Sequence, residues 1–135
     1  MPSLLLFLRL AGSVQLAIAF ANGVLPAKPK YRENLARVSP IIRQIFVVHS
    51  AYIVGVVILF AALTFGFTPE LASGRGLGRF LAAAMCAFWF FRVPVQFLYY
   101  DAALRRENRR EDVAFIAAAL FLAVTYGAAF FAQGV

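Results

Sequence analysis

Residues 41–67 read IIRQIFVVHSAYIVGVVILFAALTFGF, a run in which Arg43 is the only Lys, Arg, Asp or Glu. A helix needs about 20 mostly apolar residues to cross a hydrocarbon core about 30 Å thick, since backbone groups in lipid must bond within the segment. This run is long enough, and Ser39 and Pro40 before it suit the N-cap and first turn of a helix. The stretch therefore predicts a transmembrane helix.

Three further apolar runs have the same character, at residues 4–25, 77–100 and 113–131. Pro26 ends the first, and Asn108 and Glu111 precede the last at the spacing of a capping box. The chain is 63% apolar and 14% charged, whereas soluble chains are about half apolar and a quarter charged. We therefore expect an all-α, integral membrane four-helix bundle, with residues 1–135 forming one transmembrane domain.

The first span also has features of a secretory signal peptide, because Ala19-Phe20-Ala21 resembles a small-x-small cleavage site. However, no basic segment precedes the apolar run, and Arg9 interrupts it. We expect this span to be retained as a membrane helix.

The basic residues predict the orientation. Positive charges are retained on the cytoplasmic side of a membrane. The first and third connections carry most of them, whereas the other side has only Arg9, Arg75 and Arg79. Loops 26–40 and 101–112 are therefore predicted to be cytoplasmic and both termini external, most simply in a bacterial inner membrane. The basic residues on the cytoplasmic side are Lys28, Lys30, Arg32, Arg37, Arg43, Arg105, Arg106, Arg109 and Arg110.

The positions of the basic residues and the counts of cysteine and histidine argue against a nucleic-acid partner, a cysteine-based metal site and a bis-histidine haem. A net charge of +7 could indicate nucleic-acid binding, but the basic residues lie in short loops where topology places them, so no nucleic-acid partner is expected. Cys86 is the only cysteine and His49 the only histidine, so neither a cysteine-based metal site nor a bis-histidine haem is expected. Membrane lipids are the expected surroundings.

Arg92 is the most informative residue, because charged side chains inside a membrane are costly and mark functional sites. It lies in the third span on a stripe of polar and aromatic side chains at three- and four-residue spacing, formed by Trp89, Arg92, Gln96 and Tyr99 or Tyr100. Gln15 and His49 fall at a similar depth in the first two spans. We therefore expect Arg92, His49, Gln96, Gln15, Trp89 and Tyr99 to form one ligand-binding pocket in the cytoplasmic half of the membrane.

No Asp or Glu falls inside the four predicted spans, so the partner of Arg92 is expected from outside them. A planar guanidinium suits a carboxylate, a phosphate or an anionic lipid. Three functions remain open: binding of an anionic amphipathic or quinone-like molecule or lipid, an accessory role in a larger membrane complex or homo-oligomer, and an oligomeric anion transporter or channel. A purely structural role for these polar residues is a further alternative.

Catalysis is the least supported form of the binding hypothesis. His49 could act as a general base near neutral pH, but the sequence offers no nucleophile, base and orienting group together and no cluster of metal ligands. Binding without assigned chemistry, with a quinone or lipid in place of a cofactor, is the favoured interpretation.

The predicted topology resembles that of the membrane-associated eicosanoid and glutathione metabolism proteins. That family carries an Arg-x-x-x-Asn-x-x-Glu pattern at the start of its second helix, where residues 42–49 of this chain read IRQIFVVH. Because the pattern is absent, the resemblance is limited to topology and implies no activity for this chain.

Overall fold

The computed structural model describes residues 2–24 and 27–132, and within these ranges the chain forms helices and no strand. Four helices are long and apolar enough to cross a membrane. They are α1 (Pro2–Val24), α3 (Pro40–Gly66), α5 (Gly76–Leu98) and α7 (Arg109–Phe131). Three short helices connect them: α2 (Pro29–Ala36), α4 (Thr68–Ala72) and α6 (Ala102–Glu107). The prediction of an all-α chain is confirmed over these ranges, and so is that of four helices long and apolar enough to span a membrane.

The boundaries differ from those predicted in ways that matter for the polar residues. The third long helix ends at Leu98, two residues before the predicted end. The fourth begins at Arg109, four residues before the predicted start, and this brings Asp112 into its first turn. The predicted end of the first span, at Leu25 and Pro26, lies outside the described residues.

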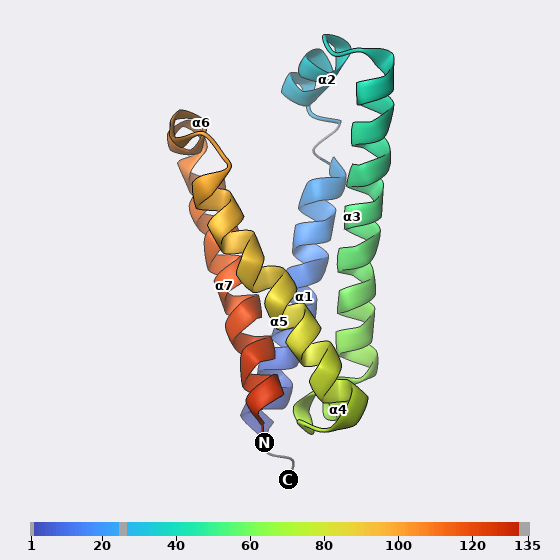
Figure 1. Cartoon of the computed structure of the whole chain (residues 1–135), viewed down its shortest axis with the longest axis vertical. Coiled ribbons are helices and arrows are strands. Elements are labelled where there is room, and N and C mark those ends of the chain that lie inside the picture. Colours follow the sequence, from blue (N-terminus) through green and yellow to red (C-terminus); the bar gives the residue numbers. More distant parts are fainter. Residues whose placement is uncertain (1, 25–26, 133–135) are drawn as a thin grey trace.

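The long helices form two hairpins (Figure 1). Helix α1 packs along α3, α5 packs along α7, and α1 also contacts α7. Figure 1 shows the two hairpins lying close together near α4, where both chain ends are also found, and diverging toward α2 and α6. We call these two ends of the bundle the α4 end and the α2/α6 end.

The tightly packed core lies toward the α4 end. Within α3 the buried residues are Val57, Ala61 and Thr64, all in its second half, whereas every side chain over residues 41–49 is exposed. Buried residues of α7 extend from Ala119 to Ala129, apart from Asp112 near its start. The hairpins therefore hold each other mainly through the half of the bundle nearer α4.

Helix α4 closes this end of the bundle and contacts all four long helices. Its Leu71 is fully buried, and the Thr68 hydroxyl donates to the carbonyl of Thr64 at 2.6 Å, satisfying one of the last carbonyls of α3. The backbone of α4 rests directly on Gly78 in the first turn of α5, where any side chain would overlap the carbonyl oxygen of Glu70.

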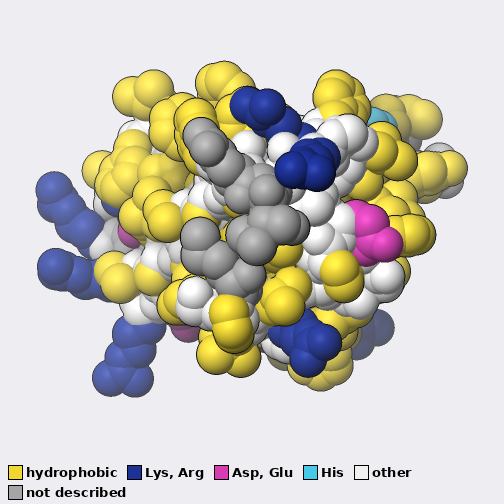
Figure 2. Space-filling model, turned by 90° about the horizontal axis from the view of Figure 1, so that it is seen from below, with side chains coloured by type: hydrophobic (Ala, Val, Ile, Leu, Met, Phe, Trp, Pro, Cys, Tyr) yellow, Lys and Arg dark blue, Asp and Glu magenta, His cyan; other side chains and the backbone are white. Residues whose placement is uncertain are grey.

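Most of the span surface is not covered by protein. At most 33% of the most apolar 18-residue window of any long helix is buried. Figure 2, a view onto the α4 end, shows hydrophobic side chains around the sides of the bundle. An apolar surface of this extent suits hydrocarbon rather than water.

Candidate functional site

One residue from each long helix meets in a buried hydrogen-bonded group, which we call the core network: Gln15 of α1, Thr64 of α3, Trp89 of α5 and Tyr126 of α7. The Trp89 indole donates to Gln15 Oε1 at 3.2 Å, and Gln15 Nε2 donates to the Tyr126 hydroxyl at 2.6 Å. The Tyr126 hydroxyl lies 2.5 Å from Thr64 Oγ1, which donates to the carbonyl of Phe60 at 2.8 Å.

Every buried side-chain nitrogen and oxygen of the core network has at least one hydrogen-bond partner. An indole can only donate, so the amide oxygen of Gln15 must face Trp89 and its nitrogen must face Tyr126. With the Thr64 proton directed to its own helix, the Tyr126 proton then points to Thr64. All of these bonds run between or within the four long helices, so this network is best explained as a connection between helices.

A second polar group lies where α5, α6 and α7 meet at the α2/α6 end, and we call it the Arg92 cluster. It consists of Arg92, Gln96, Arg105 and Asp112. Arg92 Nη1 donates to Gln96 Oε1 at 3.2 Å, and Gln96 Nε2 donates to Asp112 Oδ1 at 2.6 Å. Arg105 forms a salt bridge with the same carboxylate at 3.2 Å. Gln96 thus connects Arg92 to an acid that the predicted boundaries left outside the fourth span.

The Asp112 carboxylate is 9% exposed, which would be costly for an isolated charge. It is stabilised by two groups: Gln96, and Arg105 through Nε and Nη2 at 3.2 to 3.4 Å. Its place in the first turn of α7 is also favourable, because the helix dipole is positive there. Asp112 is therefore already well neutralised before Arg92 is considered.

Arg92 is half-buried, and aromatic rings border its guanidinium. The Cζ atom lies 4.6 Å from the ring centre of Phe115 and 5.4 Å from that of Tyr100, both within cation–π range. Among the described residues, only Gln96 accepts a hydrogen bond from Arg92, and the Nε and Nη2 groups have no acceptor. The cluster carries two guanidinium groups and one carboxylate, so it keeps a net charge of +1.

The structure does not bring the predicted site residues into one pocket. Gln15 and Trp89 belong to the core network, and Arg92 and Gln96 to the Arg92 cluster. His49 and Tyr99 are exposed, and the Nδ1 atom of His49 lies 2.9 Å from the carbonyl of Ile45 in its own helix. The six residues are thus divided between two polar groups and the surface, and the α1–α3 and α5–α7 hairpins diverge toward the α2/α6 end instead of packing together there (Figure 1).

Sequence reasoning missed four of the eight residues in the two groups: Thr64, Arg105, Asp112 and Tyr126. Tyr126 had a usable signal, since it is the only tyrosine in the fourth span and is flanked by small residues. Asp112 was set aside as a loop residue because the helix start was placed at residue 113.

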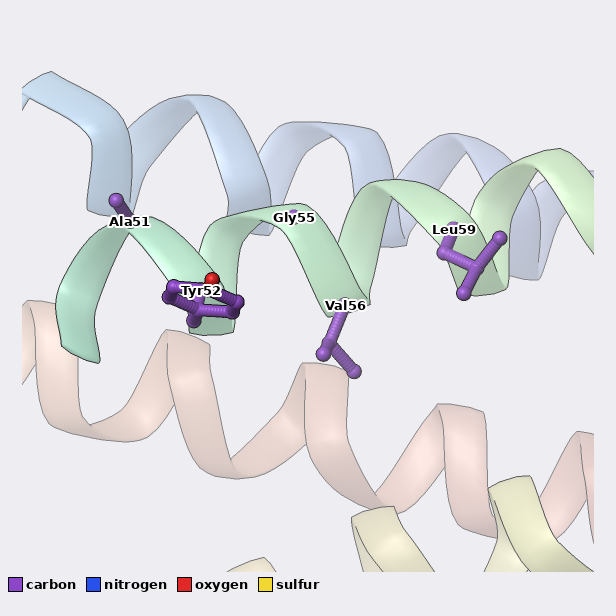
Figure 3. Close-up of a pocket in the computed structure, with 5 residues that line it drawn as sticks. All are labelled: Ala51, Tyr52, Gly55, Val56 and Leu59. Carbon is purple, nitrogen blue, oxygen red and sulfur yellow. The ribbon is translucent and has the colours of Figure 1, made fainter. Parts of the chain in front are cut away.

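Two surface hollows among the described residues are almost entirely apolar. Figure 3 shows one on the outer side of α3, lined by Ala51, Tyr52, Gly55, Val56 and Leu59, with a volume of about 330 Å³. Its only polar side-chain group is the Tyr52 hydroxyl. A second groove between α1 and α3 is lined only by apolar residues and glycine. Neither carries a charge that could orient an anionic ligand.

Comparison with protein-family models, with curated proteins and with solved structures gives no match. The class of the protein is therefore described from its own architecture, which is an all-helical bundle with four helices long and apolar enough to cross a membrane. Its function is therefore argued from the geometry of the two polar groups.

Proposed function

We propose that this protein binds an anionic amphipathic molecule, in the simplest case an anionic phospholipid, through Arg92 at the α2/α6 end of the bundle. The observation that carries the proposal is the net positive Arg92 cluster, in which the Nε and Nη2 donors of Arg92 have no acceptor within the described part of the chain. A planar guanidinium pairs best with phosphate or carboxylate. A neutral quinone carbonyl would leave the charge uncompensated.

The depth of Arg92 supports a headgroup as the ligand. Arg92 lies six residues before the last residue of α5, which is about 9 Å along the helix axis. Two of its three contacts, Gln96 and Tyr100, lie further toward that end, and Phe115 lies six residues inside α7, at about the same depth as Arg92. The side chain therefore reaches toward the membrane interface, as long basic side chains do, and its charge lies near the level of lipid headgroups.

Replacing Arg92 tests this function. We expect native mass spectrometry of the wild type, extracted in mild detergent, to show a retained anionic lipid. Arg92→Ala should reduce retention by about tenfold or more, since a hydrogen bond to a charged group contributes about 1.5–3 kcal/mol. Arg92→Lys should be intermediate, because it keeps the charge and loses the planar fork.

Arg106→Ala is the matched control, because it removes an exposed arginine from α6 at the same end of the bundle. It should retain the lipid as the wild type does. Equal retention by all four proteins, with unchanged thermal unfolding, would contradict the proposal. An acidic membrane polypeptide co-purifying in place of lipid, in an Arg92-dependent way, would instead support the accessory-subunit function.

We also propose that the α2/α6 end faces the cytoplasm, with the chain in a bacterial cytoplasmic membrane. In support, most Lys and Arg residues lie in or beside α2 and α6, against only Arg9, Arg75 and Arg79 toward the α4 end. An anionic cytoplasmic leaflet would also supply ligand to the Arg92 cluster.

Cysteine labelling tests this orientation. In a Cys86→Ala background, single cysteines replace Glu70 in α4, Asn34 in α2 and Glu107 in α6, all of which are exposed. In intact bacterial cells an impermeant maleimide should label Glu70→Cys alone, and permeabilisation should expose the other two. The reverse pattern would mean that the α2/α6 end is external.

A further inference from the structure

The facing sides of α3 and α5 meet at one aromatic contact, and both are exposed on the side of that contact nearer the α2/α6 end. Phe60 of α3 and Phe88 of α5 meet edge to face, with ring centres 5.1 Å apart. Seven residues, or about two turns, toward the α2/α6 end, the same helix faces carry Ile53 and Val95. These side chains are 52% and 42% exposed. The two apolar stripes that meet at Phe60 and Phe88 are thus exposed nearer the α2/α6 end.

Arg92 stands on this uncovered face of α5. It follows Phe88 by four residues and Trp89 by three, which places it one turn further along the same side of the helix. Phe88 contacts α3, and the Trp89 indole reaches Gln15 of α1, so this side is directed toward the α1–α3 hairpin. Arg92 is therefore carried on the side of α5 that faces the other hairpin, and its guanidinium contacts Phe115 of α7. Figure 1 shows that the two hairpins have begun to diverge toward this end of α5.

We propose that one hydrocarbon chain of an anionic phospholipid lies between the two hairpins, against Ile53 and Val95, with its headgroup phosphate on Arg92. This inference rests on the proposed function and adds the position of the lipid tail. The net charge of the Arg92 cluster selects the anion, and the two apolar stripes accommodate the chain.

The length of the uncovered face fits such a chain. On α3 it extends from Phe60 past Ile53 to Phe46, itself 39% exposed, which is about 21 Å along the axis. One leaflet contributes half of a hydrocarbon core about 30 Å thick. A chain that enters at the level of Gln96, which the guanidinium reaches, and ends at the Phe60–Phe88 contact follows α5 for eight residues, or about 12 Å, which is close to that depth.

Photo-crosslinking from α3 tests this position, because Arg92 belongs to the other hairpin. A benzophenone side chain is placed at Ile53, in protein reconstituted into phosphatidylcholine vesicles containing some phosphatidylglycerol. We expect the captured lipid to be enriched in phosphatidylglycerol about fivefold over the vesicle composition. The enrichment should disappear when Arg92→Ala is added, and Arg106→Ala should preserve it.

A benzophenone at Leu59 is the matched control, because this exposed residue lines the hollow on the outer side of α3 that Figure 3 shows. It should capture both lipids in the vesicle ratio. Capture in that same ratio at Ile53, or crosslinking of Ile53 to α5, would overturn the proposed tail position. If native mass spectrometry still showed Arg92-dependent retention, the proposed function would stand without it. Absence of both the phosphatidylglycerol enrichment at Ile53 and the Arg92-dependent lipid retention would overturn both the tail position and the proposed function.

Discussion

Gly78→Ala is expected to destabilise the bundle by about 3 kcal/mol, the upper end of the usual cost of overpacking. A Cβ atom at this position would overlap the carbonyl oxygen of Glu70 and lie 2.6 Å from its carbon. These are backbone atoms of α4, so no side chain can turn aside and α4 itself must move. Because α4 contacts all four long helices, the shift would loosen the whole α4 end. Unfolding by sodium dodecyl sulfate in mixed micelles, followed by circular dichroism, measures the change.

Gly55→Ala is the control for that variant. Gly55 lies inside α3, and a Cβ atom there would meet nothing within 4 Å. Inside a helix, alanine is more favourable than glycine by up to about 1 kcal/mol. The Gly55→Ala protein should therefore be at least as stable as the wild type. If the two variants behaved alike, close packing of α4 on α5 would not be a source of stability.

Tyr126→Ala is expected to cost at least about 3 kcal/mol of unfolding free energy. The side chain is fully buried, so its removal leaves a cavity, which is the main cost of large-to-small substitutions. The change also removes the hydroxyl that contacts both Gln15 and Thr64. Tyr126→Phe keeps the ring and isolates the hydrogen bonds, and should cost about 1 kcal/mol, as such bonds do inside membranes.

Tyr52→Ala provides the comparison for Tyr126→Ala, because Tyr52 is 74% exposed on the outer side of α3. Its loss should change the unfolding free energy by no more than about 0.5 kcal/mol. The same detergent titration serves for all three tyrosine variants. A Tyr126→Ala protein as stable as Tyr52→Ala would show that the core network does not hold the hairpins together.

The four spans could be predicted from the sequence because a membrane requires long apolar helices whatever their packing. The short helices α2, α4 and α6 were not predicted, since each is too short to show a clear periodic pattern. The start of α7 was misplaced because Arg109 to Asp112 are charged, and charge was taken to mark a loop. Because of that error, Asp112 was not recognised as the acid that Gln96 connects to Arg92.

The candidate site could be predicted only in part, because spacing along a helix specifies a face and a depth but not the partner across from it. The stripe of Trp89, Arg92 and Gln96 on one side of α5 was predicted. The stripe divides between two different polar groups, since Trp89 faces α1 where the hairpins meet and Arg92 lies where they have separated. The divergence itself depends on packing among four helices, which no local pattern encodes.

The hairpin arrangement also has a consequence for how the chain is made. Each main interface joins membrane helices that follow one another in sequence, α1 with α3 and α5 with α7. During synthesis from the N-terminus, the first hairpin can therefore assemble before the second has left the ribosome. Until α7 arrives with Tyr126, the amide nitrogen of Gln15 lacks the acceptor that it has in the finished bundle. Helix α7 is the latest of these four to be inserted, so the polar interior is completed only when it arrives.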